Sequence, residues 1–176
     1  MKQLLSLLLC LSIIVPSMAK KEQRKQNVFP DGTPISEWFL QTKVVHPDSL
    51  GKKYDLSDYG IESNPHIVQT QKIQKIIDEA AANGGGVIYI PEGIYKSGSL
   101  FFKQGTHLYL SKGATLLGSE NIMDFPLLMT RIEGEYCKYF GALINADGLD
   151  TFTISGKGTI DGNGTPYWNC LLYTSD

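Results

Sequence analysis

The chain has 176 residues, of which 42% are hydrophobic and 19% are charged. This balance is typical of a folded globular protein and excludes an intrinsically disordered chain. The net charge of −2 gives no electrostatic basis for binding nucleic acid or an anionic membrane. The length of 176 residues predicts one domain, or part of a larger one. Because of the low net charge, we expect neither of these partners.

The first 19 residues have the pattern of a signal peptide. Lys2 supplies a positive start, residues 4–15 form an apolar core, and Ser17-Met18-Ala19 places small residues at a cleavage site. A membrane anchor is the weaker alternative, because this core is shorter than the roughly 20 residues that span a bilayer. We predict a signal peptide at 1–19 and export to the periplasm or the extracellular space. Without Cys10, too few cysteines remain to predict a disulfide framework.

Residues 20–53 form a polar, irregular N-terminal arm with several prolines. A turn is expected at Pro30-Asp31-Gly32, followed by the aromatic pair Trp38 and Phe39. We expect these two rings to pack the arm onto the domain; an arm that binds a partner is the alternative.

Residues 54–60 are predicted to form a short strand that enters a turn, and one helix is predicted after it, at about 67–82. Ile73, Ile76, Ile77 and Ala80 recur at helical spacing and form a single apolar stripe. Asn64-Pro65 resembles a helix start, and Asn83-Gly84 is a typical helix stop. Because only one side is apolar, this helix should cover a hydrophobic surface.

After Gly86 the sequence changes to short β-branched or aromatic segments separated by turn residues. These segments are VIYIP, SLFF, THLYL, ATLLG, ALINA, TFTIS and GTIDG. A sandwich, a barrel and a solenoid all remain compatible with this pattern.

An internal similarity favours the solenoid. LYLSKGATLLGS resembles FTISGKGTIDGN, which aligns Leu108 with Phe152, Leu110 with Ile154 and Leu116 with Ile160. The common offset of 44 residues corresponds to two coils of about 22 residues each, a length typical of stacked β-coils. Each coil would bury its apolar face against its neighbours, and the helix would cap the open end.

The order of these motifs resembles a known family. DYG, the helix, NGGGVIYIPEGIY, GSLFFKQGTHLYLSKGATLLGS, FPLLMTRIEG and ISGKGTIDGNG are together similar to the N-terminal part of the family 28 glycoside hydrolases, the polygalacturonases and rhamnogalacturonases. The resemblance covers about residues 28 to 169. It implies a right-handed, single-stranded parallel β-helix of the pectate-lyase-like superfamily, with its N-terminal portion at 54–169 and a capping helix at about 67–82. It also implies secretion and action on pectic polysaccharide or oligosaccharide, with no cofactor.

The resemblance further implies inverting hydrolysis by paired carboxylic acids. In the family these acids lie in an Asn-x-Asp motif and an Asp-Asp pair, followed by Gly-His-Gly and Arg-x-Lys. The Asp-Asp, Gly-His-Gly and Arg-x-Lys patterns do not occur in the 176 residues, so we expect no catalytic residue in this chain. Asp161 is expected to form a side-chain turn rather than act as an acid, and Asp161-Gly162-Asn163 is only a weak match to a calcium loop.

Arg131 is the candidate substrate-binding residue. It lies in an insertion at about 119–141, close to Tyr136, Tyr139 and Phe140. A guanidinium suits bidentate binding of a uronate carboxylate, and tyrosines suit stacking on sugar faces. The alternative is an Arg131 paired with Glu133 or Glu135 inside the insertion.

Two other functions fit the same pattern: a β-helical pectate or rhamnogalacturonate lyase that uses calcium, and a non-catalytic β-helical carbohydrate-binding scaffold. The last residues, CLLYTSD at 170–176, resemble a reading frame of a transposon-end adapter used in sequencing libraries, so we expect them to be read-through. We also expect the chain by itself to be an inactive fragment, insoluble or oligomeric, because a cut stack exposes apolar surface and unpaired strand edges.

Overall fold

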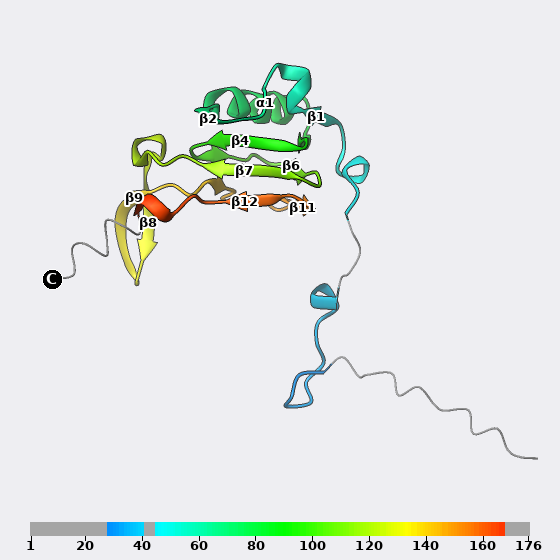
Figure 1. The fold of residues 1–176 in the computed structure, drawn as a ribbon. Helices are drawn as coiled ribbons and strands as arrows, with labels where there is room; N and C mark the ends of the chain where they lie inside the picture. Colours follow the sequence, from blue (N-terminus) through cyan, green and yellow to red (C-terminus); the bar gives the residue numbers. More distant parts are fainter. Residues whose placement is uncertain (1–27, 41–44, 168–176) are drawn as a thin grey trace, which may run out of the picture. The chain divides into compact units, whose positions relative to one another are not determined.

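The computed structural model describes residues 28–40 and 45–167 (Figure 1). The chain divides into two compact units, Met1–Thr42 and Lys43–Asp176, which are described separately. The predicted signal peptide and the predicted read-through segment lie outside the described residues. Within the described part, no helix is both long enough and apolar enough to span a membrane.

In the first unit, a tight turn precedes a 3-10 helix. An antiparallel bridge joins Val28 to Pro34, and the Asp31 side chain accepts a hydrogen bond of 3.0 Å from the Thr33 amide. The 3-10 helix η1 spans Glu37–Leu40 and carries Trp38 and Phe39, whose ring centroids lie 3.8 Å apart. The proposed packing of these rings on the domain remains a prediction.

The second unit opens with short elements and the α-helix. They are η2 (Pro47–Leu50), β1 (Lys53–Asp55), η3 (Leu56–Tyr59), β2 (Asn64–Val68) and α1 (Thr70–Ala82). The short strand and the turn predicted at 54–60 are therefore present, as β1 and η3. After Asp55 the chain turns into η3, because the Asp55 side chain accepts the Ser57 amide and starts a helical turn.

The predicted start of the helix at residue 67 is wrong. Residues Asn64–Val68 pair instead with β4 as an edge strand, and α1 begins at Thr70. Ile67 and Val68 are β-branched, which favours a strand, and an edge strand tolerates Pro65 because one side of its backbone needs no donor. The helix ends as expected, with the Gly85 amide donating to the Ala80 carbonyl at 2.8 Å.

The remainder of the unit is almost entirely β. Its strands are β3 (Gly86–Ile90), β4 (Gly93–Ser97), β5 (Leu100–Phe101), β6 (Thr106–Leu110), β7 (Ala114–Gly118), β8 (Leu127–Ile132), β9 (Glu135–Phe140), β10 (Ile144–Asn145), β11 (Ile154–Gly156) and β12 (Thr159–Asp161), with a 3-10 turn η4 at Ile122–Asp124. All seven predicted segments contain a strand. The sequence pattern did not predict β4 or the pair β8 and β9.

The strands form two parallel four-stranded sheets, ordered β1-β3-β6-β11 and β2-β4-β7-β12, and a small parallel pair of β5 and β10. Each pass of the chain therefore adds one strand to each large sheet. Figure 1 shows α1 at the β1–β2 end of this stack and β11 and β12 at the other end. This parallel, mostly β architecture confirms the coarse fold prediction.

The register corrects the predicted repeat. Gly86 pairs with Thr106 and Gly93 pairs with Ala114, so a regular pass takes 20 or 21 residues. Leu116 pairs with Ile160 as predicted, but Leu108 pairs with Ile154 rather than with Phe152. The offset of 44 residues is thus one lengthened pass between neighbouring strands, not two coils, because the insertion containing β8 and β9 falls within it.

The core lies between the two sheets and under α1. Alternate residues of β6 and β7, such as Leu108 and Leu116, are fully buried, as expected for strands with one face inside. The helix contributes its apolar stripe, and Ile73, Ile76, Ile77 and Ala80 are all buried in the same cluster. On the outer face, Tyr89 and Tyr109 stack with their ring centroids 5.4 Å apart.

Candidate functional site

The insertion after β7 forms an antiparallel hairpin of β8 and β9 (Figure 1). Its two-residue turn is Glu133-Gly134, and both residues have positive φ, at 51° and 95°. Two positive φ values in succession are typical of the turns that suit the twist of a hairpin. At the other end, the Gly141 amide donates to the Pro126 carbonyl at 2.8 Å and closes the base of the hairpin.

The hairpin has two different faces. Residues paired across a hairpin share a face, and successive pairs alternate between faces. The first face, here called the basic face, carries the pairs Leu127–Phe140, Met129–Lys138 and Arg131–Tyr136. The second, here called the groove face, carries the pairs Leu128–Tyr139, Thr130–Cys137 and Ile132–Glu135.

Arg131 lies near the tip of the basic face. Its side chain is exposed, and its Nε donates to the Gly134 carbonyl at 3.1 Å. Its cross-strand neighbour Tyr136 is 78% exposed. Among the ion pairs of the described residues, none joins Arg131 to Glu133 or Glu135. The guanidinium head therefore retains donors that a bound carboxylate could use.

A groove of about 780 Å³ lies along the other side of the hairpin. Its wall comes from the groove face together with Met129 and Phe140, and its floor comes from the region of β5 and β10. The lining residues are Phe101, Phe102, Leu128, Met129, Thr130, Ile132, Tyr139, Phe140, Gly141, Ala142, Asn145 and Asp147. The groove therefore combines large apolar surfaces with a few polar groups, as ligand-binding clefts commonly do.

The Asn145 side chain fixes the floor of the groove. Its Nδ2 donates to the Leu100 and Ala142 carbonyls at 3.1 and 2.7 Å, and its Oδ1 accepts from the Ala142 amide at 3.0 Å. Both amide hydrogens are thus used inside the protein: one holds β10 against β5, and the other holds the turn that precedes β10. Asn145 shapes the groove and has little donor capacity left for a ligand.

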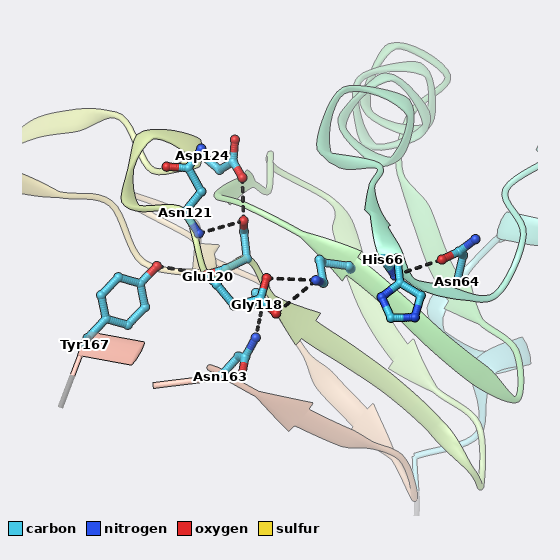
Figure 2. A network of polar contacts seen from close by, with 10 residues as sticks. Asn64, His66, Gly118, Glu120, Asn121, Asp124, Asn163 and Tyr167 are labelled. Carbon is cyan, nitrogen blue, oxygen red and sulfur yellow. Dashed lines mark hydrogen bonds and ion pairs between the residues drawn. The ribbon is translucent and has the colours of Figure 1, made fainter. Parts of the chain in front are cut away.

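A polar network surrounds the point where the chain leaves β7 (Figure 2). Lys96 from β4 reaches Glu120 with Nζ–O distances of 2.8 and 3.1 Å. The hydrogen bond from Lys96 is the main cause that lowers the pKa of Glu120 to about 2. Asn163, after β12, donates its side-chain amide to the Gly118 carbonyl at 3.1 Å.

The same network holds the start of the insertion. The Ser119 hydroxyl donates to Asp124, the Asn121 side chain accepts the Met123 amide, and the Tyr167 hydroxyl donates to the Ser119 carbonyl at 2.9 Å. Figure 2 shows Asn121, Asp124 and Tyr167 gathered near Glu120 and Gly118, where β7 ends. Because the polar groups satisfy one another, we interpret the network as support for the hairpin rather than as a reaction centre.

The remaining sequence candidates have structural roles. The Asp161 carboxylate accepts the Asn163 amide at 2.8 Å, which confirms the predicted side-chain turn. His107 is half-buried on β6, and burial lowers its pKa. No group of three or more His, Cys, Asp or Glu side chains within residues 28–40 and 45–167 is placed to hold a metal ion.

The sequence indicated the insertion and Arg131, but it did not indicate the groove or the network. Lys96, Glu120 and Asn163 belong to three different passes of the chain. Only the register of the sheets brings them together, so no local motif could have revealed them. To predict the two faces of the hairpin from the sequence, one would have to recognise Glu133-Gly134 as its turn, because the turn sets which residues pair.

No family model matches the chain. It is 33% identical over 147 residues to the exo-poly-alpha-D-galacturonosidase of Dickeya chrysanthemi. This match covers 79% of this chain and 24% of that protein. It is 37% identical over 129 residues to the plasmin and fibronectin-binding protein A of Streptococcus pneumoniae, covering 71% of this chain and 17% of that protein. A third relative, named "Probable polygalacturonase", comes from Vitis vinifera, with 28% identity over 64% of this chain and 25% of the relative.

The chain is also similar to solved structures of exopolygalacturonases. The Yersinia enterocolitica family 28 exopolygalacturonase matches with a TM-score of 0.57 and 33% identity, over 64% of this chain and 21% of that one. The Thermotoga maritima exopolygalacturonase matches in fold with a TM-score of 0.59 and 24% identity, over 64% of this chain and 25% of that one.

The fold and these matches define the class first: a parallel β protein with the architecture found in exopolygalacturonases. Within that class, the chain is a family 28-like protein. It spans about a quarter of the length of the Dickeya relative.

Proposed function

We propose that the chain is part of a secreted glycoside hydrolase that cleaves pectin-type polysaccharide, either polygalacturonan or rhamnogalacturonan, by inverting hydrolysis. The observation that carries the proposal is the combination of the parallel two-sheet stack with relatives named for acting on polygalacturonate. The predicted export fits such a substrate, because a polysaccharide is too large to enter a cell before it has been cleaved.

The proposal includes the finer fold. Each pass adds one strand to each sheet, and α1 buries its stripe at one end of the stack. We interpret this as the beginning of a right-handed, single-stranded parallel β-helix capped by α1. Further coils of such a stack would carry the catalytic acids, because inversion requires two carboxyl groups about 6.5–9.5 Å apart and the Asp-Asp pair of the family does not occur among the described residues.

The part played by this chain is binding rather than bond cleavage. On the basic face, Arg131 offers a planar pair of donors to a uronate carboxylate, and Lys138 adds a second positive charge. The exposed ring of Tyr136 beside Arg131 offers a surface on which a sugar can stack. The hairpin would thus form one wall of a cleft for an acidic polysaccharide.

The whole gene product should hydrolyse polygalacturonate, with new reducing ends accumulating in solution. Proton NMR of the first products should show the anomeric configuration opposite to that of the cleaved bond, since inversion is a single displacement. An unsaturated product absorbing in the ultraviolet would instead indicate a lyase. Retention of configuration would contradict the inverting mechanism, and no cleavage of any pectic polymer would contradict the enzyme.

Arg131→Ala in the whole gene product should weaken oligogalacturonate binding on the order of tenfold, because a charge-assisted hydrogen bond is lost. Arg131→Lys should recover only part of the affinity, since lysine cannot make the bidentate contact. Lys112→Ala, in the exposed turn between β6 and β7, is the charge-matched control. Unchanged affinity in Arg131→Ala, measured by calorimetry, would remove Arg131 from the binding site.

One relative favours a second candidate function. The Streptococcus protein is named for binding plasmin and fibronectin, and its match covers 71% of this chain. A non-catalytic scaffold built on the same fold is therefore the alternative for this chain. The hydrolysis assay separates the two, because a scaffold binds its ligand without releasing reducing ends.

A further inference from the structure

We infer that the groove between the hairpin and the β5–β10 pair binds an uncharged sugar unit that carries a methyl group at its C6 end. Two pectic units have this chemistry: a galacturonate whose carboxyl group is methyl-esterified, and a 6-deoxyhexose. The inference rests on the proposed function, and it assigns the two faces of the hairpin to different parts of the polymer.

The first argument is the charge of the groove. Among its lining residues, all within the described part of the chain, Asp147 is the only charged side chain and none is Lys, Arg or His. A free uronate bound here would face a like charge without a compensating cation, which disfavours binding. Esterification or replacement of the carboxyl group removes that penalty. The two cations of the hairpin, Arg131 and Lys138, lie on the opposite face.

The second argument is the apolar surface. Leu128 and Ile132 from the hairpin line the groove together with Phe101 and Phe102 from the floor. Tyr139 on the same face is 54% exposed, which leaves part of its ring free for a sugar. A methyl group gains from such a lining, whereas a carboxylate would lose its hydration there.

The polar groups of the groove are few. Asn145 uses both of its amide hydrogens inside the protein. The Thr130 and Tyr139 hydroxyls are the side-chain donors that remain among the lining residues. Two hydroxyls can orient the ring hydroxyls of one sugar without supplying the charge that an acid would need.

The test uses leucine methyl groups as reporters in the whole gene product. Leu128 is on the groove face and lines the groove, whereas Leu127 is on the basic face, is 58% exposed and does not line it. With 13C-methyl leucine labelling, methyl glycosides of galacturonate, of its 6-methyl ester and of rhamnose are titrated in turn. The Leu128 signals, assigned with Leu128→Met, should move with the ester or with rhamnose but not with the free acid, while the Leu127 signals stay in place.

The three probes separate the sources of the shared chemistry. Movement with the ester alone assigns the groove to esterified galacturonan, and movement with rhamnose alone assigns it to a deoxyhexose-containing chain. An equal response to free galacturonate, or no response of Leu128 to any probe, would overturn the inference. Because Leu128 lies on the groove face, this result is independent of whether the protein hydrolyses polygalacturonate.

A charge variant sharpens the test. Asp147→Asn should remove the selectivity, so that the free acid binds about as tightly as the ester, which it should not do in the unmodified protein. One apolar group in a pocket is worth on the order of tenfold in affinity, which sets the scale of selectivity that could be lost. Asp150→Asn is the matched control, because Asp150 is a neighbouring exposed aspartate that does not line the groove. Equal selectivity in all three proteins would exclude Asp147 as the selecting group.

A variant of the groove wall supplies a second control. Ile132→Ser should weaken the response to the ester, whereas Leu127→Ser, on the opposite face, should leave it unchanged. Both residues are exposed enough to be changed without emptying the core, at 37% and 58%. A loss of response in both variants would point to unfolding of the hairpin and would contradict a site specific to its groove face.

Discussion

The strands from β3 to β7 and the hairpin of β8 and β9 are made of similar residues but use them differently. In the stack, apolar side chains such as Leu108 and Leu116 have no exposed surface. In the hairpin, Leu127 and Met129 are 58% and 65% exposed. The buried apolar residues of the stack stabilise the fold, whereas those of the hairpin remain at the surface, where a ligand can cover them.

The backbone shows the same contrast. Stack strands pair in parallel with strands from other passes, so each is held by residues far away in the sequence. The hairpin pairs with itself, and its turn needs only Glu133 and Gly134. A change in the hairpin should therefore stay local, while a change in the stack should spread to its neighbours.

The largest expected difference comes from one leucine in each region. Leu108→Ala should lower the free energy of unfolding by about 2–5 kcal/mol, because it leaves a cavity between strands. Leu127→Ala should change it by no more than about 0.5 kcal/mol, because that side chain is mostly in water. Denaturant unfolding of both variants measures the difference, and equal losses would show that the hairpin is part of the cooperative core.

Two glycines give the next effect. Gly156 has a φ of 110°, and a side chain there would collide with the Leu110 carbonyl. That carbonyl cannot move freely, because it accepts the amides of Lys157 and Gly158. Gly156→Ala should thus cost about 2–4 kcal/mol from backbone strain and collision.

Gly134 has a similar φ of 95°, but a side chain there would meet only the end of Arg131, at 3.9 Å. Gly134→Ala should then cost only the strain of the left-handed region, about 1–2 kcal/mol. Thermal unfolding monitored by circular dichroism ranks the two variants. A larger loss at Gly134 would reverse the proposed division between the stack and the hairpin.

The smallest effect tests the junction of the two regions. Because the pKa of Glu120 falls from 4.5 to about 2 in the folded protein, its stabilisation is complete above pH 4.5 and is lost as the pH falls toward 2. The melting temperatures of the native protein and of Glu120→Gln should therefore differ at neutral pH and converge in acid. Glu92→Gln, at another exposed glutamate, is the control, and a pH-independent difference would exclude the Lys96–Glu120 pair as its source.

Much of the stack could be predicted from the sequence. The alternation in THLYL and ATLLG gives strands with one buried face, and both appear at those residues. The exact register could not be predicted, because Phe152 and Ile154 are both apolar and have the same parity along the chain. Either residue could pair with Leu108 without turning an apolar side chain to the other face of the sheet. The structure shows that Ile154 does so, with the Leu108 amide donating to the Thr153 carbonyl.

The site could be predicted only in outline. Arg131 was identified because its chemistry suits an acidic sugar, but no sequence pattern showed that Lys138 and Tyr136 would share its face. The hairpin has apolar residues on both sides, so its pattern does not show which side is covered. The network around Glu120 depends on residues up to 71 positions apart, from Lys96 to Tyr167, and such contacts follow from the fold alone.

The bond between the Gly141 amide and the Pro126 carbonyl has a consequence for how such proteins diversify. The chain enters and leaves the hairpin at almost the same point, so the insertion resembles an exchangeable cassette. Lengthening, shortening or replacing it adds little loop-closure entropy and leaves the paired strands on either side in register. New specificities could therefore be grafted at this position while the rest of the protein remains as it is.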